Sequence, residues 1–295
     1  MPELPEVEIV RRGLEPVLLG RRIVRAEQRR KDLRFPFPDG FVRRLEGRTA
    51  TLLRRRAKYL MAYLDSGEVL VMHLGMSGRF TVGKAGGSAG RVIGDYEYET
   101  GSSPKHDHVV FAMEKGVTIT YNDPRRFGFM LLLSESELET HPLFVNLGVE
   151  PLGNQLSADY LAKRALGRKT DLKAFLMDQR NVAGLGNIYV CEALFRAGLS
   201  PLRKASSLAV RGGGPTDRAE RLVPAIRSVL AEALDAGGST LKDYRQADGS
   251  RGAFQEAHSV YDRDGERCVR KACRGTVMRL VQGQRSTFYC KVCQR

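Results

Sequence analysis

The chain of 295 residues is long enough for two domains that each bury a core, with room for a small extra module. Its net charge of +14, its pI near 9.8 and its 42% of hydrophobic residues are typical of a folded protein that binds a polyanion such as nucleic acid. The sequence has no signal peptide, its cysteines do not form the framework of a small secreted protein, and no apolar run approaches the roughly 18 residues of a membrane span. We therefore expect a monomeric cytoplasmic protein, with no membrane partner.

A helix is predicted directly after the amino terminus, because Pro5 suits a first turn and carboxylates precede arginines along the segment. The initiator methionine is expected to be removed before a residue as small as proline. Removal leaves the secondary amine of Pro2 beside the Glu3 carboxylate. An α-amino group with a pKa of about 8 is partly unprotonated at neutral pH, so it can act as a nucleophile while Glu3 moves protons. The other interpretation is a purely structural helix start.

Short β-rich runs follow and predict a sandwich or barrel. They span residues 22–28, 47–55, 59–64, 69–73, 108–113 and 117–121. Lys58 ends a basic run in this region. It is either a solvent-exposed lysine at a strand edge or a residue with a role in an active site. Residues 83–103, rich in glycine and serine, are expected to form a surface excursion.

Apolar residues recur at three- to four-residue spacing from residue 157 to residue 236, which predicts an α-helical second domain. The boundary is expected between Ser134 and Gly153. Cys191 falls in an apolar helical stripe, so we interpret it as a buried free thiol.

The last 28 residues contain four cysteines in two pairs, Cys268 with Cys273 and Cys290 with Cys293. Two pairs separated by a hairpin-length insert supply the four soft ligands of a tetrahedral zinc site. We therefore predict one structural Zn²⁺, with two disulfides or four reduced thiols as alternatives. The insert predicts a strand, a turn and a strand, with Arg285 at the tip.

Seven segments in order resemble the bacterial formamidopyrimidine-DNA glycosylases. They are PELPEVE at 2–8, RRRAKYL at 54–60, HLGMSG at 73–78, KHDHV at 105–109, NDPRRFG at 122–128, DQRNVAGLGNIYVCEALFRAG at 178–198 and the cysteine module. The resemblance implies an α+β multidomain fold with an N-terminal β-sandwich, a helix-two-turn-helix domain and a C-terminal β-hairpin zinc finger. We place these at residues 1–135, 150–240 and 259–295, with a mobile lesion-covering loop and linker at 241–258.

The resemblance also implies an activity and a catalytic set. The family removes oxidised purines such as 8-oxoguanine and formamidopyrimidines from duplex DNA, acts on abasic sites, and cleaves the strand by β- and δ-elimination. Pro2 matches the nucleophile that attacks C1′, Glu3 the proton donor and Glu6 a second carboxylate. Lys58 matches the lysine of the elimination steps, and Arg285 of the finger is assigned to the same catalytic set.

Further positions match contacts to DNA. Met76, Arg125 and Phe127 fit side chains that fill the gap left by an extruded nucleotide, although an ordinary core position is the other interpretation of Phe127. The remaining matched positions are His73, His106, Lys169, Lys173, Asn187 and Tyr261. Asn187 follows a glycine-rich turn that opens a helix, a geometry suited to phosphate. A metal site at His106 and His108 is the less favoured interpretation.

The sequence departs from the family pattern at several points. Four residues separate Cys268 from Cys273, where the family usually has two. Ala253 replaces a common aromatic in the segment 242–254 that matches the lesion-covering loop, Asp262 replaces a usual glycine, and Cys191 replaces a common polar residue.

Two other functions remain open. The sister endonuclease VIII class removes oxidised pyrimidines with the same proline chemistry, although it usually has glycine where this chain has Leu4. A zinc-containing DNA-binding protein without catalysis would bind DNA in a salt-sensitive manner and cut nothing.

Overall fold

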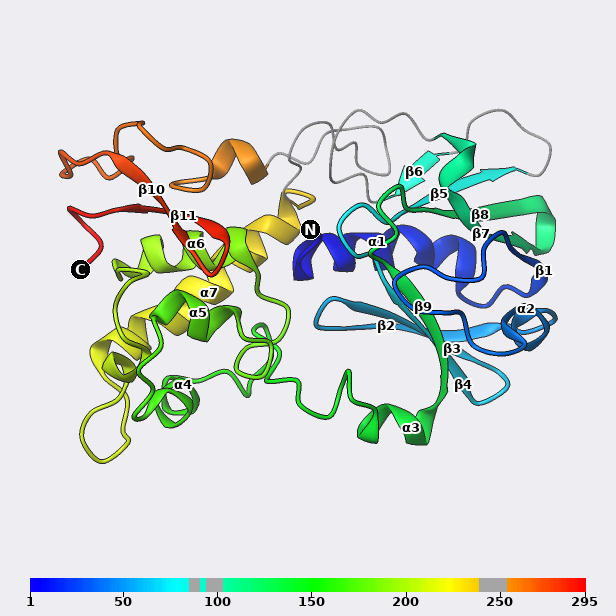
Figure 1. Ribbon diagram of the computed structural model, residues 1–295, viewed down its shortest axis with the longest axis horizontal. Helices are drawn as coiled ribbons and strands as arrows, with labels where there is room; N and C mark the ends of the chain where they lie inside the picture. The colour runs from blue at the N-terminus through cyan, green and yellow to red at the C-terminus, as the bar shows by residue number, and fades with distance from the viewer. Residues whose placement is uncertain (85–90, 94–102, 239–253) are drawn as a thin grey trace. The chain divides into compact units, whose positions relative to one another are not determined.

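The computed structural model describes residues 1–84, 91–93, 103–238 and 254–295 (Figure 1). The expectations for the excursion at 83–103 and for the lesion-covering loop, including Ala253, concern segments that lie mostly outside the described residues. The chain forms two compact units. The first unit comprises residues 1–145 and 234–255, and the second comprises residues 146–233 and 256–295.

The first unit is a β-sandwich, as predicted. All neighbouring strands in its two sheets are antiparallel. One sheet has the order β1 (Ile23–Gln28), β7 (Asp107–Met113), β8 (Val117–Asn122), β5 (Arg79–Lys84) and β6 (Arg91–Ile93). The other has the order β2 (Ala50–Arg56), β3 (Tyr59–Leu64), β4 (Glu68–His73) and β9 (Phe129–Ser134).

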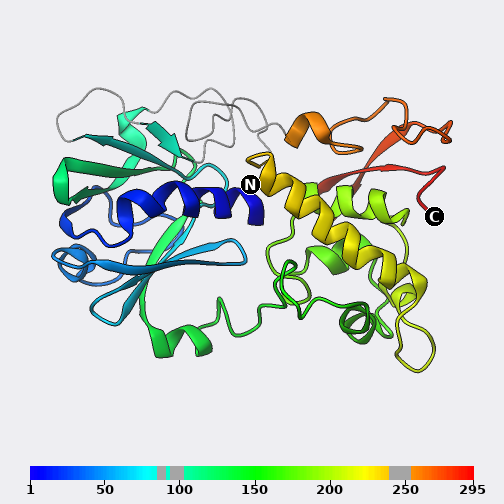
Figure 2. The same ribbon diagram turned by 180° about the vertical axis from the view of Figure 1, so that it is seen from behind.

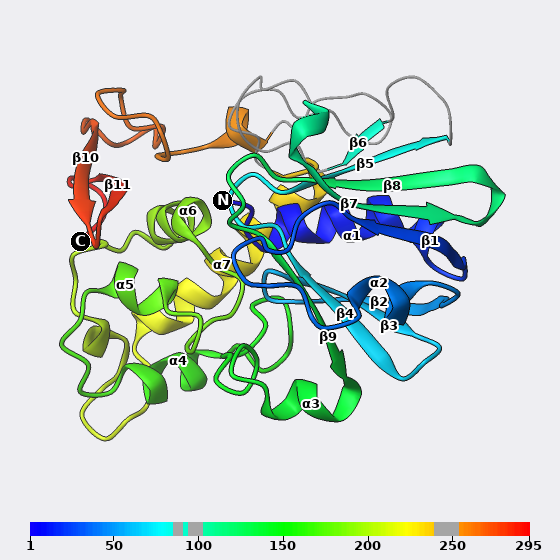
Figure 3. The same ribbon diagram turned by 45° about the vertical axis from the view of Figure 1, so that its right-hand side comes forward.

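Helix α1 (Leu4–Leu18) lies between the two sheets of this unit (Figure 3). Its apolar face, with Val10 and Leu14, joins one core cluster with Leu60 of one sheet and Phe111 of the other. A short helix, α2 (Phe41–Leu45), adds Phe41 to the same cluster. The outer face of the four-stranded sheet packs against Leu138 of α3 (Glu135–Thr140). The sandwich therefore fixes the start of α1 against both sheets.

The second unit is helical, as predicted, and carries a two-stranded hairpin (Figure 2). Its helices are α4 (Ala158–Ala165), α5 (Leu172–Met177), α6 (Asn187–Ala197) and α7 (Asp217–Asp235), of which α7 ends in the first unit. Ser157 caps α4 and Asp171 caps α5 through side-chain oxygens, and Gly198 ends α6 with a φ of +71°. The hairpin consists of β10 (Val277–Gln282) and β11 (Arg285–Cys290).

Short 3-10 turns complete the described structure at Pro104–His106, Glu114–Gly116, Ala205–Leu208 and Phe254–Ala257. Within the described ranges, no helix combines the length and the apolar character needed to cross a bilayer.

Candidate functional site

The head of α1 is built around two buried carboxylates. Glu3 and Glu6 form a capping box, in which Glu6 Oε2 accepts the backbone N–H of Glu3 at 2.8 Å. Pro2 is buried with them. A side chain at Gly238, the last described residue before the 239–253 segment, would place its Cβ 3.3 Å from Glu6 Oε1. The backbone at Gly238, which belongs to the same unit, therefore packs closely against the first turns of α1.

Lys58 lies in the tight turn between β2 and β3. Arg56 pairs with Tyr59 across this hairpin, which leaves Ala57 and Lys58 as a two-residue turn with a φ of +52° at Ala57. Arg55 Nη1 donates to the Ala57 carbonyl at 3.0 Å. The solvated-edge interpretation of Lys58 is wrong, because the residue is only 6% exposed.

His73, at the end of β4, is held as a neutral ring. It stacks on Phe129 with ring centres 5.1 Å apart, and its Nδ1 accepts the Gly75 N–H at 3.0 Å. Burial first, then the positive charges of Lys58 and Arg34, lowers the pKa of His73 to about 4. With Nδ1 acting as an acceptor, Nε2 carries the proton and is the nitrogen that can donate to a ligand.

Met76, Arg125 and Phe127 lie on two neighbouring loops of the first unit. Met76 is half-buried in the loop after β4, whereas Arg125 and Phe127 are exposed between β8 and β9. The Arg125 guanidinium carbon lies 5.1 Å from the centre of the Phe127 ring. The core interpretation of Phe127 is wrong, because the side chain is 46% exposed.

The two nearby histidines form no metal site. His106 is half-buried in a 3-10 turn, and its carbonyl accepts the Asp123 N–H at 3.0 Å. His108 Nε2 lies 2.8 Å from the Asp123 carbonyl oxygen, and burial lowers the pKa of His108. Across the described part of the chain, the one group of three or more metal-ligating side chains is the cysteine cluster.

In the second unit, the predicted phosphate-binding residues meet the hairpin. Asn187 begins α6 and donates through Nδ2 to the Ser286 carbonyl at 2.9 Å. Lys173 on α5 is 1% exposed, and its Nζ donates to the same carbonyl at 3.1 Å and to Thr287 Oγ1 at 2.6 Å. Lys173 therefore holds the strand that begins with Arg285.

Three other predicted site residues, Tyr261, Arg285 and Lys169, also lie in the second unit. The Tyr261 hydroxyl accepts from Asn187 Nδ2 at 3.4 Å, and its ring packs edge-on against Phe288. Arg285 is exposed and pairs with Gln282 directly beside the hairpin turn. Lys169 is exposed in the loop between α4 and α5.

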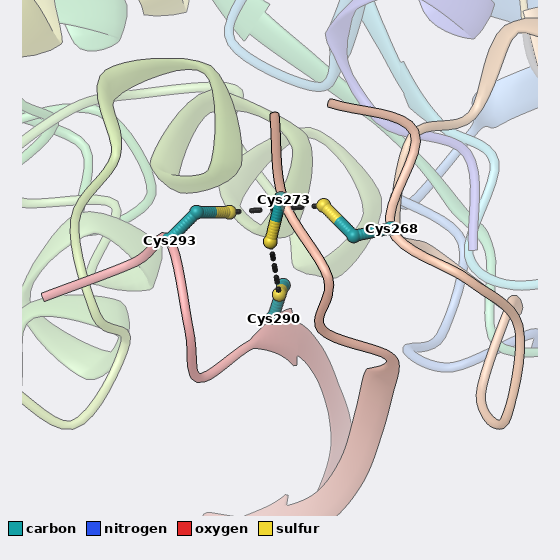
Figure 4. Close-up of side chains that lie close together, drawn as sticks. All are labelled: Cys268, Cys273, Cys290 and Cys293. Atoms are coloured by element: carbon teal, nitrogen blue, oxygen red, sulfur yellow. Dashed lines mark hydrogen bonds between the residues drawn. The ribbon is translucent and has the colours of Figure 1, made fainter. Parts of the chain in front are cut away.

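The four cysteines converge from two turns, one before β10 and one after β11 (Figure 4). Their sulfur atoms all lie within 4.8 Å of one another, with 3.7 Å between Cys268 and Cys293 and 3.6 Å between Cys273 and Cys290. In a tetrahedral site with Zn–S bonds of about 2.3 Å, sulfurs lie about 3.8 Å apart. The cluster can therefore hold a metal ion, and none of the four forms a disulfide.

Comparison with known proteins identifies the family. The model of the formamidopyrimidine-DNA glycosylase N-terminal domain matches residues 1–130, and the model of the formamidopyrimidine-DNA glycosylase H2TH domain matches residues 147–245. The formamidopyrimidine-DNA glycosylase of Chelativorans sp. is 59% identical, with all of both chains covered. The chain belongs to the formamidopyrimidine-DNA glycosylase family.

Solved structures of formamidopyrimidine-DNA glycosylases share the fold. The MutM (Fpg) protein of Thermus thermophilus is 39% identical, with 99% of this chain and 98% of that chain covered and a TM-score of 0.80. Lactococcus lactis Fpg in complex with DNA containing an abasic site is 29% identical, with 99% of both chains covered and a TM-score of 0.83. A mutant of the same enzyme in complex with Fapy-dG DNA is 28% identical over all of both chains, with a TM-score of 0.84.

Two residues with no recognisable sequence motif hold the finger on α6. The fully buried Glu192 carboxylate accepts the backbone N–H groups of Ser259, Val260 and Tyr261 at 2.9–3.1 Å. Arg270 donates through Nη2 to the carbonyls of Phe195 and Arg196 at the end of α6. Glu192 is the one acidic residue in the apolar run of α6, and this position in the sequence could have indicated a buried carboxylate with a structural role.

The unusual cysteine spacing accounts for the position of Arg270. Arg270 lies among the four residues between Cys268 and Cys273, and its guanidinium lies 4.8 Å from the Phe195 ring centre. A cation near the last carbonyls of a helix is favoured by the helix dipole. The wider turn thus keeps the cysteines together and adds a contact to α6.

Proposed function

We propose that this protein is a bifunctional DNA glycosylase and abasic-site lyase that removes oxidised purines from duplex DNA. The observation that carries the proposal is the head of α1, where Pro2 directly precedes the buried Glu3 and a capped helix. Full-length identity of 59% to a named formamidopyrimidine-DNA glycosylase supports the substrate class.

The chemistry begins at the amino terminus. Removal of Met1 frees the Pro2 nitrogen, which forms a bond to C1′ of the damaged nucleotide as the bond from C1′ to the base breaks. Glu3 donates a proton to the sugar ring oxygen, the ring opens, and the nitrogen is left as an iminium. The iminium acidifies the protons on C2′, so their loss expels the 3′ phosphate, and a further elimination expels the 5′ phosphate.

The surrounding residues support these steps. Glu6 holds the backbone of Glu3 and thereby positions the nucleophile. Lys58 supplies a buried positive charge and an amine for the eliminations. The neutral Nε2–H of His73 suits a phosphate oxygen as a donor, because it requires no titration near neutral pH.

Extraction of the lesion needs side chains that fill the space it leaves in the base stack and residues that bind the phosphates of the DNA backbone. Met76, Arg125 and Phe127 serve as the replacement, since an exposed ring with a guanidinium above it can stack into a vacated step. Asn187 and Tyr261 act on phosphates near the lesion.

The remaining residues predicted to contact DNA bind its backbone or orient other side chains that do so. Lys169, Arg285 and His106 extend the contacts to the DNA backbone. Lys173 acts through the hairpin, because its ammonium holds the carbonyl that follows Arg285. The activity places the protein with the chromosome in the bacterial cytoplasm.

We further propose that the metal held by the four cysteines is Zn²⁺. Four thiolate sulfurs at tetrahedral spacing favour zinc, which crosslinks the two turns and carries no step of the reaction. The position of Arg285 and the packing of Tyr261 on Phe288 depend on the hairpin that this crosslink stabilises.

The test uses duplexes that contain 8-oxoguanine or an oxidised pyrimidine, with base release and strand ends measured separately. The proposal predicts release of 8-oxoguanine and strand products with phosphates at both ends of the gap. An uncleavable extension at the amino terminus should abolish both, and the same extension at the carboxyl terminus should abolish neither.

The outcomes separate the competing functions. Faster release of the oxidised pyrimidine would favour the endonuclease VIII class. Salt-sensitive DNA binding without release or scission would identify a non-catalytic protein and overturn the proposal.

A further inference from the structure

The loops that carry Met76, Arg125 and Phe127 are joined at their base by close backbone contact. The first loop spans residues 74–78 and the second spans residues 123–128. A Cβ built on Gly75, where φ is +62°, would lie 2.3 Å from the backbone nitrogen of Gly128 and 2.3 Å from the carbonyl carbon of Phe127. This approach leaves no room for a side chain.

A buried carboxylate lies at this junction. Asp123 Oδ1 accepts the Ser77 hydroxyl at 2.6 Å, and Asp123 Oδ2 accepts the Gly128 N–H at 2.8 Å. The Tyr121 hydroxyl donates to the same Oδ2 at 3.4 Å. Burial, then the neighbouring Asp123 carboxylate, raises the pKa of Tyr121, so the phenol keeps its proton and remains a donor.

Ser77 links the two loops directly. Its hydroxyl donates to Asp123 and accepts the backbone N–H of Arg125 at 3.2 Å. Ser77 follows Met76 in the chain, and Arg125 lies two residues before Phe127. One hydroxyl therefore fixes the spacing between the first loop and the backbone that presents the exposed Arg125 and Phe127.

The glycines of both loops are matched to this network. A Cβ at Gly128 would lie 1.9 Å from the Tyr121 hydroxyl oxygen, and a Cβ at Gly78 would lie 2.4 Å from it. Tyr121 thus rises between two glycines to reach Asp123. A charge-assisted network centred on a buried carboxylate favours one arrangement of its members over many.

We propose that Ser77 and Asp123 are positioning residues that hold Met76, Arg125 and Phe127 at a fixed spacing before DNA binds. The inference rests on the proposed function, in which these three side chains occupy the gap opposite the orphaned base. Loops that are ordered in advance lose less conformational entropy when they enter the duplex. The hydrogen bonds of Ser77 and Asp123 therefore contribute to extraction of a paired lesion and not to the chemistry at C1′.

The test compares two substrates. One is duplex DNA with 8-oxoguanine opposite cytosine, and the other is an abasic site facing a one-nucleotide gap, where no orphaned base needs support. Loss of the hydrogen bond to the Asp123 carboxylate should lower single-turnover excision from the paired duplex by about tenfold to a hundredfold in Ser77→Ala. Cleavage of the gapped substrate should fall by less than about threefold.

Two further variants make the result specific. Gly75→Ala, which forces the loop backbones apart, should show the same selective loss. Ser136→Ala removes an exposed hydroxyl on α3 that bonds only to Ser134 in the described structure, so it should behave as wild type on both substrates.

Each outcome decides the inference. Equal losses on both substrates, or paired-duplex activity within about threefold of wild type in Ser77→Ala, would overturn it while the proposed function stands. Wild-type protein that processes neither substrate would refute the proposed function and this inference with it.

Discussion

The attachment of the finger to α6 should depend on Glu192. In Glu192→Ala, the buried N–H of Val260 and the half-buried N–H groups of Ser259 and Tyr261 lose a carboxylate acceptor. A buried donor without a partner costs about 1–3 kcal/mol, and because such costs are not additive we expect a loss of about 3–5 kcal/mol in the free energy of unfolding. Glu192→Gln should lose about 1–2 kcal/mol, because one oxygen remains for Val260 and Tyr261.

The assay is urea unfolding of the zinc-loaded protein, with hydrogen exchange of the 259–261 amides measured by mass spectrometry. Glu232→Ala is the matched control. Its carboxylate pairs with Arg196 at 2.7 Å on the same helix α6 but is 52% exposed, so its loss should cost less than about 1 kcal/mol. The reasoning is refuted if Glu192→Ala unfolds like wild type and the three amides stay protected.

Three further changes have defined outcomes. The pKa of His73 is lowered to about 4 in the folded protein, so the free energy of unfolding should fall by about 3 kcal/mol as the pH drops from 6.5 to 4. Urea unfolding at several pH values measures this dependence, and His73→Asn should flatten it. Cys290→Ser should lose the bound zinc in elemental analysis and loosen the hairpin, whereas Cys191→Ser should retain one zinc per chain. Arg270→Ala should speed zinc release to a chelator because the finger loses its contact to α6, whereas exposed Lys271→Ala should not; equal release rates would contradict that role.

The sequence patterns predicted a sandwich or barrel, a helical unit and a hairpin, and the family resemblance implied the sandwich. Strand alternation located β3 at the residues observed, and helical spacing located α6 and α7. These patterns missed β9, because the segment Phe129–Ser134 is a short apolar run without alternation, which fits a helix equally well. They also missed β5, whose register is set by pairing with the distant β8.

The site was predictable where chemistry depends on local order. The four cysteines could be found from residue type and spacing alone, whereas the catalytic interpretation of Pro2 beside Glu3 also depends on the family resemblance. The burial of Lys58 and Lys173 could not be found in this way, because each depends on elements far away in the chain: the sandwich for Lys58 and the hairpin 113 residues later for Lys173. The same limit explains why the sequence did not single out Arg270, whose partners lie on α6.

Mapping of the reduced covalent intermediate will show whether the processed amino terminus is the nucleophile. The protein is incubated with duplex DNA containing 8-oxoguanine in the presence of borohydride, digested, and examined by mass spectrometry. If Pro2 is the nucleophile, one sugar adduct is expected, on the peptide that begins with Pro2. An adduct on a lysine such as Lys58, or full excision by protein that retains Met1, would contradict this role of Pro2.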